Sequence, residues 1–322
     1  MAAPTNTATT LSQTGNREDL TDILERVAPE ATPFMSNIGA AGKAKANYHE
    51  WQTEDLATPS ADGVLEGDDT TSYEENVTDR LGNHTQIFKR AFVVSGTQEV
   101  VNKAGRSSEL ARHRVLKSTE IKRDVELALL RNGASRVQSG SNPRLSGGAL
   151  AWCETNTNRG TGGADGGFDG TATVAAATNG TQRAFAKDQI DAVLRSIFTN
   201  SGQSKRRHMY MSPFHKDAFA AFSGITQIQN DVTGRQQAVI YGAADMYMSS
   251  YGPILTIPHP YALTRDVFIA DHQYMGVSTL RAMKEEKLAK TGDNEKRHII
   301  CEKTLCVKNE KALGAIRDLT TT

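Results

Sequence analysis

A long acidic segment followed by a long basic one constrains the fold of this chain more than any other feature. Residues 48–90 are polar, acidic and interrupted by glycines at positions 63, 67 and 82, and they carry too few apolar side chains for a core of their own. Residues 108–132 instead carry apolar side chains at the spacing of a helix face. A helix of about 24 residues spans about 36 Å at 1.5 Å per residue. The order of these two segments predicts a long loop followed by a long helix.

The first of these segments predicts a two-stranded loop over residues 48–94. Residues 48–58 have a strand-like pattern, and the returning limb, residues 85–94, becomes apolar again with Ile87, Phe88 and Phe92. A polar two-stranded hairpin of this length is marginal by itself in water. The loop is therefore expected to need a partner surface.

The second segment predicts one helix over residues 108–132. Ser107 and Ser108 are suitable N-cap residues, and Asn132-Gly133 is a suitable stop. Ile121 and Val125 lie on its apolar stripe, which Leu127, Leu129 and Leu130 widen near the end.

Opposite charges are separated along these two segments, although 37 acidic and 37 basic residues give the chain no net charge. The acids are Asp62, Glu66, Asp68, Asp69, Glu74, Glu75 and Asp79. The bases are Lys103, Arg106, Arg112, Arg114, Lys117, Lys122 and Arg123, with only Glu109 and Glu120 among them.

Separated opposite charges can fix the register between neighbouring subunits. We therefore hypothesise that the seven acids form an inter-subunit interface with Arg106, Arg112, Arg114, Lys117 and Arg123. Two independent solvated faces are an equally good interpretation. A nucleic-acid contact of the basic helix is a third, which the neutral net charge disfavours.

Length and composition predict two domains with extensions, since 322 residues exceed what one compact core usually holds. No window approaches the roughly 20 apolar residues of a membrane span. Residues 1–16 are typical of a flexible arm and lack the features of a signal peptide. Three cysteines, Cys153, Cys301 and Cys306, are too few for a disulfide framework and fit a reducing compartment.

The rest of the chain predicts a mixture of helices and strands. A short helix is expected from Asn16, ended by Pro29 and Pro33, and the glycine-rich residues 158–170 are expected to be a mobile connection. From residue 184 the pattern predicts an α/β domain: helices around Ile190–Ile197 and after Ser212-Pro213, and strands at 208–211, 254–257 and 267–270. Residues 280–290 and 298–307 predict a closing hairpin with its turn at 291–294.

No enzyme motif, cofactor site or metal site is expected. Residues 160–165 lack the last glycine of a dinucleotide fingerprint, and neither a Gly-x-Ser-x-Gly elbow nor a P-loop occurs. His298, Cys301 and Cys306 match no common zinc spacing, so strand core is the better interpretation. A hydrolase or transferase remains the alternative from another class, and it would need a pocket of converging polar groups.

Two further residue types are assigned structural roles. Met209, Met211, Met246 and Met248 lie at strand spacing and are expected to pack in the core. Trp51 and Trp152 are expected to anchor loops to the body.

The order of parts resembles the major capsid proteins of tailed bacteriophages, whose fold is shared with herpesvirus capsid floors and encapsulin shells. The resemblance is closest for Arg17-Glu18-Asp19-Leu20-Thr21-Asp22 with Thr32-Pro33-Phe34, and for Ala289-Lys290-Thr291-Gly292-Asp293 leading to Glu302-Lys303-Thr304-Leu305. It implies an α+β fold with these parts: an N-terminal arm and short helix (1–47), an extended loop (48–94), a peripheral domain (95–183) with spine helix 108–132, an axial domain (184–280), and C-terminal strands returning to the peripheral domain (281–322).

The resemblance also implies a structural function. The chain is expected to be no enzyme, to need no cofactor, and to self-assemble in the host cytoplasm into hexamers and pentamers of the icosahedral virion capsid around double-stranded DNA. Its expected partners are itself, a portal, scaffold or decoration proteins, and weakly and non-specifically the packaged DNA, but no membrane. No scaffolding segment of the family's kind precedes the arm, so a separate scaffold or none is expected. The alternative is an encapsulin-like nanocompartment that encloses a cargo enzyme.

Overall fold

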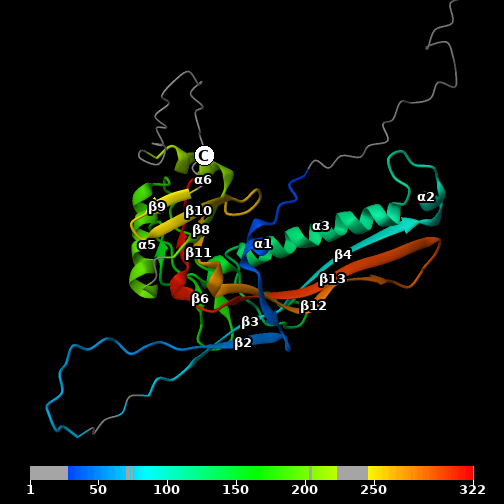
Figure 1. Cartoon of the computed structure of the whole chain (residues 1–322). Helices are drawn as coiled ribbons and strands as arrows, with labels where there is room; N and C mark the ends of the chain where they lie inside the picture. Colours follow the sequence, from blue (N-terminus) through cyan, green and yellow to red (C-terminus); the bar gives the residue numbers. More distant parts are fainter. Residues whose placement is uncertain (1–27, 70–72, 74, 203–204, 223–245, 322) are drawn as a thin grey trace, which may run out of the picture.

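The fold is α+β, as expected, and is built around two larger sheets and one long helix, with two further two-stranded sheets, β2-β3 and β6-β7 (Figure 1). The computed structural model describes residues 28–69, 73, 75–202, 205–222 and 246–321. The arm of residues 1–16 and the helix predicted from Asn16 lie outside these residues.

The first sheet has four strands in the order β1-β12-β13-β4. β12 and β13 form a long antiparallel hairpin, β4 pairs antiparallel with β13, and β1 pairs parallel with β12. This hairpin corresponds to the closing hairpin predicted from the sequence. The strands are β1 (Ala40–Lys43), β4 (Gln86–Ser95), β12 (Met275–Lys287) and β13 (Asn294–Val307).

The long helix α3 (Glu109–Leu130) packs along this sheet, mainly against β4 (Figure 1). Ser108 caps it by accepting a hydrogen bond from the backbone N–H of Ala111, and Ile121, Val125 and Leu129 are buried. The helix ends two residues before the predicted position 132.

The second sheet has six strands in the order β5-β14-β11-β8-β10-β9. Helices α5 (Lys187–Ser201) and α6 (Pro213–Ala220) pack on it through a core of Ile190, Leu194 and Phe219. α5 ends at Gly202, whose φ of 64° is left-handed and therefore favours glycine. The strands are β5 (Thr157–Asn158), β8 (Arg207–Met211), β9 (Met246–Ser249), β10 (Gly252–Pro258), β11 (Val267–Ala270) and β14 (Gly314–Ile316).

The second sheet takes strands from three of the sequence ranges expected to be separate parts. β8 to β11 lie within 184–280, whereas β5 lies within 95–183 and β14 within 281–322. The C-terminal range therefore contributes β13 to the first sheet and β14 to the second.

The remaining elements are short. They are α1 (Pro33–Ile38), β2 (Tyr48–Thr53), β3 (Asp79–His84), α2 (Gly96–Val100), α4 (Ala149–Trp152), β6 (Gly167–Phe168), β7 (Val174–Ala175) and the 3-10 helices His272–Tyr274 and Glu310–Ala312.

Pro33 begins helix α1, which the sequence analysis did not predict, and the earlier helix that Pro29 and Pro33 were expected to end lies outside the described residues. The first helical position has no intrahelical partner for its backbone nitrogen, so proline fits there with its fixed φ.

Part of the glycine-rich segment 158–170 packs against another segment of the chain, although its composition predicted a surface connection. Gly160 is buried, and its backbone N–H donates to the Asp318 carboxylate at 3.1 Å. A Cβ atom at Gly160 would collide with the carbonyl oxygen of Thr181. The glycine serves close packing of two chain segments.

The methionine prediction is half wrong. Met209 and Met211 are fully buried, but Met246 and Met248 are 58% and 69% exposed. The latter two lie on β9, the last strand of the six-stranded sheet. Alternation along the sequence cannot distinguish an edge strand from a central one.

The tryptophan prediction is confirmed, and Cys301 lies buried in a strand as expected. Trp152 is buried between Trp51 of β2 and Phe168 of β6, with ring centroids 5.7 Å from each. All three cysteines are buried, and the described part of the chain holds no cluster of residues that could bind a metal ion.

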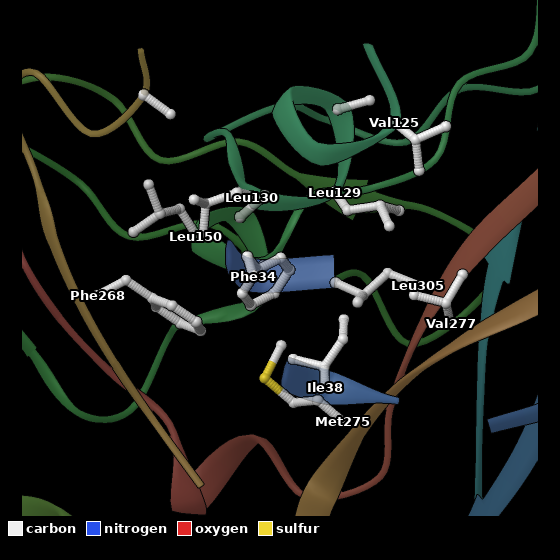
Figure 2. Close-up of a cluster of buried hydrophobic side chains, with 14 of the residues drawn as sticks. Phe34, Ile38, Val125, Leu129, Leu130, Leu150, Phe268, Met275, Val277 and Leu305 are labelled. Atoms are coloured by element: carbon white, nitrogen blue, oxygen red, sulfur yellow. The ribbon is translucent and has the colours of Figure 1, made fainter. Parts of the chain in front are cut away.

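Phe34 of α1 lies at the centre of the main core (Figure 2). Val125, Leu129 and Leu130 of α3 surround it from one side, and Phe268 of β11 from another. Helix α1, through Phe34, therefore joins α3 to the six-stranded sheet.

A buried carboxylate holds this junction. Glu126 of α3 accepts hydrogen bonds from the backbone N–H groups of Phe34 at 2.6 Å and Met35 at 2.7 Å. His259 Nε2 lies 3.1 Å from the same carboxylate, and His259 Nδ1 accepts from the N–H of Ala262, so the ring proton is on Nε2. Glu126 and His259 are both fully buried.

We predict that Glu126→Ala lowers the free energy of unfolding by about 3–5 kcal/mol, because it leaves three buried N–H donors without their acceptor, each at a cost of about 1–3 kcal/mol. Urea denaturation of the unassembled subunit measures this change. The control is Glu120→Ala on the same helix, whose partly exposed pair with Lys117 should contribute at most about 1 kcal/mol. Equal losses in the two variants would contradict the prediction.

Candidate subunit interface

The extended loop leaves the body between β2 and β3 and runs far from both sheets (Figure 1). β2 and β3 pair antiparallel from Tyr48 opposite His84 to Thr53 opposite Asp79. Beyond this pairing, Val64 and Leu65 are 80% and 82% exposed, and Tyr73 is 86% exposed. Apolar side chains gathered on a projecting loop are typical of a surface that another molecule covers.

The acids that the sequence analysis assigned to an inter-subunit interface are exposed, and within the described part of the chain they form no ion pair. The ion pairs on the limbs of the loop, Arg80 with Glu50 and Lys311 with Asp55, involve other acids. Glu74 lies outside the described residues. The described acids are Asp62, Glu66, Asp68, Asp69, Glu75 and Asp79.

The helix bases of the hypothesis mostly have partners within the chain, which sequence reasoning missed. Arg106 and Arg112 both pair with Glu109, and Lys117 Nζ lies 2.8 Å from Glu120. The sequence could have predicted these three ion pairs, because in each pair the acid lies three residues from the base.

The other two bases have partners that are distant in sequence. Arg114 pairs with Glu285 of β12 at 2.5 Å, and Arg123 lies over the ring of Tyr261, 5.1 Å from its centroid. No local pattern could have identified these partners. The structure brings none of the described loop acids to the five bases within one subunit.

A shallow groove between α3 and β4 presents further bases. It is lined by Ile87 and Lys89 of β4 and by Leu127 and Arg131 at the end of α3. Ile87 and Leu127 are partly exposed, and neither Lys89 nor Arg131 has an ion-pair partner among the described residues. Arg90 beside them is held by Asp124 through two hydrogen bonds of 2.7 Å. The groove is thus bordered by residues of both elements, and two of its bases, Lys89 and Arg131, have no ion-pair partner among the described residues.

Comparison with known proteins identifies the family of this chain. The family model described as SU10 major capsid protein matches residues 3–320. The chain belongs to this family. Members of the family are structural capsid proteins and not enzymes, so the expectation of no enzymatic function is confirmed.

Individual relatives agree with this assignment. The chain is 31% identical over 126 residues to the major capsid protein of Escherichia phage Phieco32, and the match covers 39% of this chain and 35% of that protein. The chain thus spans about a third of the length of this curated relative.

Solved capsid structures share the fold along nearly the whole chain. The capsid of cyanophage A-1(L) matches with a TM-score of 0.65 at 15% identity, covering 98% of this chain and 100% of that one. The capsid of cyanophage P-SCSP1u matches with a TM-score of 0.62 at 10% identity, covering 99% and 97%. At these identities the matches establish the fold. None of these relatives favours the encapsulin-like alternative. No described helix is long and apolar enough for a membrane span.

Glu109, at the start of α3, predicts a pH dependence of stability. Burial opposes its ionisation, but hydrogen bonds from Arg112 and Arg106 outweigh burial and lower its pKa from 4.5 to about 2. A carboxylate with a lowered folded-state pKa contributes stability that is complete above its unfolded pKa and is lost as the pH falls through its folded pKa.

We therefore expect Glu109→Gln to be less stable than the wild type at pH 7, with the difference shrinking as the pH falls from about 5 towards 2. Urea denaturation of both proteins across this range measures the difference. A difference that does not depend on pH would contradict the assignment of the effect to the Glu109 charge.

Proposed function

We propose that this chain is the shell-forming subunit of a tailed phage, which self-assembles into hexamers and pentamers of an icosahedral capsid around double-stranded DNA. The observation that carries the proposal is the projecting loop, whose apolar side chains are exposed and whose described acids form no ion pair within the described part of the subunit. A second copy of the chain supplies the missing surface, and symmetry repeats the contact around the shell.

The proposed contact places the loop of one subunit on the basic side of its neighbour. Val64 and Leu65 supply apolar area, which is the main source of affinity. Exposed ion pairs each contribute only about 0–1 kcal/mol, so the acids add little affinity. Their role is to fix the register in which the loop lies on the neighbouring subunit. The acceptor proposed from the sequence is the set Arg106, Arg112, Arg114, Lys117 and Arg123.

The groove between α3 and β4 extends this acceptor. Lys89 and Arg131 carry positive charge that no described acid of their own chain neutralises, whereas Arg106, Arg112 and Lys117 already have acidic partners. An incoming acid gains more from an unpaired base than from one already paired. We therefore place the loop acids primarily against Lys89 and Arg131.

The remaining assignments follow the same proposal. The first sheet with α3 corresponds to the peripheral domain, and the six-stranded sheet to the axial domain around the capsomer centre. A wall without net charge makes only weak, non-specific contact with DNA. A portal and scaffold or decoration proteins are the further partners, and assembly takes place in the host cytoplasm.

The first test is negative-stain electron microscopy of the concentrated protein together with sedimentation. Closed shells, tubes or capsomer rings are expected. A protein that stays a small oligomer, alone and with the scaffold from its own phage, would contradict the proposal.

A charge-swap experiment tests the contact itself. We expect that reversing Glu66, Asp68 and Asp69 to lysine leaves the subunit folded but abolishes assembly, because like charges then face each other. Reversing Lys89 and Arg131 to glutamate should have the same effect. Combining the two sets should restore shells.

The control is the same loop variant combined with Arg112→Glu and Lys117→Glu. If this combination restores assembly and the groove combination does not, the helix and not the groove receives the loop. Normal assembly of the loop variant alone would exclude the loop acids from the contact.

A further inference from the structure

The two limbs of the extended loop are joined where they leave the body. Asn47 precedes β2 and Thr85 follows β3, and the backbone N–H of Thr85 donates to the carbonyl oxygen of Asn47 at 2.8 Å. Thr85 is fully buried. The two limbs are therefore joined at Thr85, which is buried, although Asn47 itself is exposed.

Glu302 of β13 holds this point from the body. Its side chain is 3% exposed, and its Oε1 accepts from the Thr85 hydroxyl at 2.7 Å. Arg144 donates to the same carboxylate and also, through Nε, to the carbonyl oxygen of Thr85 at 2.8 Å. Arg281 Nε donates to Oε2 at 2.9 Å. Thr85 is thus held through both its side chain and its backbone.

A second buried polar residue supports the same place. The amide of Asn83 donates to the carbonyl oxygens of Leu305 at 2.9 Å and Gly147 at 3.1 Å, and it accepts from the N–H of Gly147 at 2.8 Å. These bonds tie β3 to β13 and to the loop that carries Arg144.

Beyond this base, Trp51 of β2 packs against Trp152 of the body and His49 Nε2 lies 3.0 Å from the Ser278 hydroxyl, but the ion pairs of the loop are weak. Arg80 and Glu50 pair across β2 and β3, with their side chains 70% and 33% exposed, and this pair joins one limb to the other but not to the body. Lys311 and Asp55 do join the loop to the body, but both side chains are largely exposed. Exposed pairs hold geometry poorly, because solvent and salt screen them.

We propose that Glu302 is the positioning residue that sets the direction in which the extended loop leaves the subunit. A two-stranded hairpin can keep its own pairing and still swing about its base. The buried carboxylate prevents this by joining Thr85 to β13 through charged hydrogen bonds, which are stronger than neutral ones. The inference deepens the proposed function, because a loop that reaches a neighbour must leave in a defined direction.

The test measures this direction in single subunits. Cysteines introduced at exposed Gln52 on β2 and exposed Lys122 on α3 carry spin labels, while the three native cysteines are buried. Labelled full-length protein is diluted with unlabelled protein, so that only distances within one subunit are recorded by pulsed electron paramagnetic resonance. The wild type should give one narrow distance distribution, and Glu302→Gln should lose it.

Two further variants make the result specific. Glu50→Gln breaks the exposed pair on the same hairpin and should keep the narrow distribution. Thr85→Val leaves Glu302 paired with both arginines and keeps the Arg144 bond to the backbone, but it removes the direct hydrogen bond between Glu302 and the loop base, so it should broaden the distribution even if Glu302→Gln fails to fold.

A folded Glu302→Gln or Thr85→Val variant with an unchanged narrow distribution would overturn the inference. Equal broadening in Glu50→Gln would also overturn it, because the direction would then be set along the hairpin and not at its base. The measurement needs no shell, so its failure is distinguishable from failure of the proposed assembly.

Discussion

The fold depends on the buried carboxylate of Glu126. It accepts two backbone N–H groups from α1 and the ring N–H of His259, and these donors come from opposite sides of α3 in the sequence. A buried charge is tolerated only where several donors compensate for lost water. This constraint fixes α1 between α3 and the six-stranded sheet, so that Phe34 can centre the core they share.

The same chemistry occurs at Glu302, with a different consequence. Both glutamates are buried and fully hydrogen-bonded, but Glu126 joins parts of the body, whereas Glu302 joins the body to the base of a projecting loop. Beyond that base, the loop exposes apolar side chains such as Val64 and Leu65 together with acids such as Asp68. The molecule thus combines a rigid attachment with an unsatisfied surface, which is the combination that a lattice subunit requires.

Much of the fold could be predicted because its signals are local. Ser108 and the apolar spacing up to Leu130 predict α3, and the alternation around Ile299 and Cys301 predicts β13. The errors arose where tertiary context reversed a local preference. Gly160 packs against another segment, and Met248 lies on an edge strand. For the candidate interface, the acids were found by sequence, but Lys89 and Arg131 were not, because they come together only when β4 packs on α3.

The sequence by itself determined the long helix, the long acidic loop and the membership of a capsid family, because periodicity, charge and similarity are all written along the chain. Only the tertiary structure decided which charges remain free. Arg114 pairs with Glu285 and Arg123 lies over Tyr261, although these residues are far apart in the sequence, so both bases already have partners within their own chain. Lys89 and Arg131 have no ion-pair partner within the described chain. The physical reason is that electrostatic interaction depends on distance in space, which the order of residues does not specify.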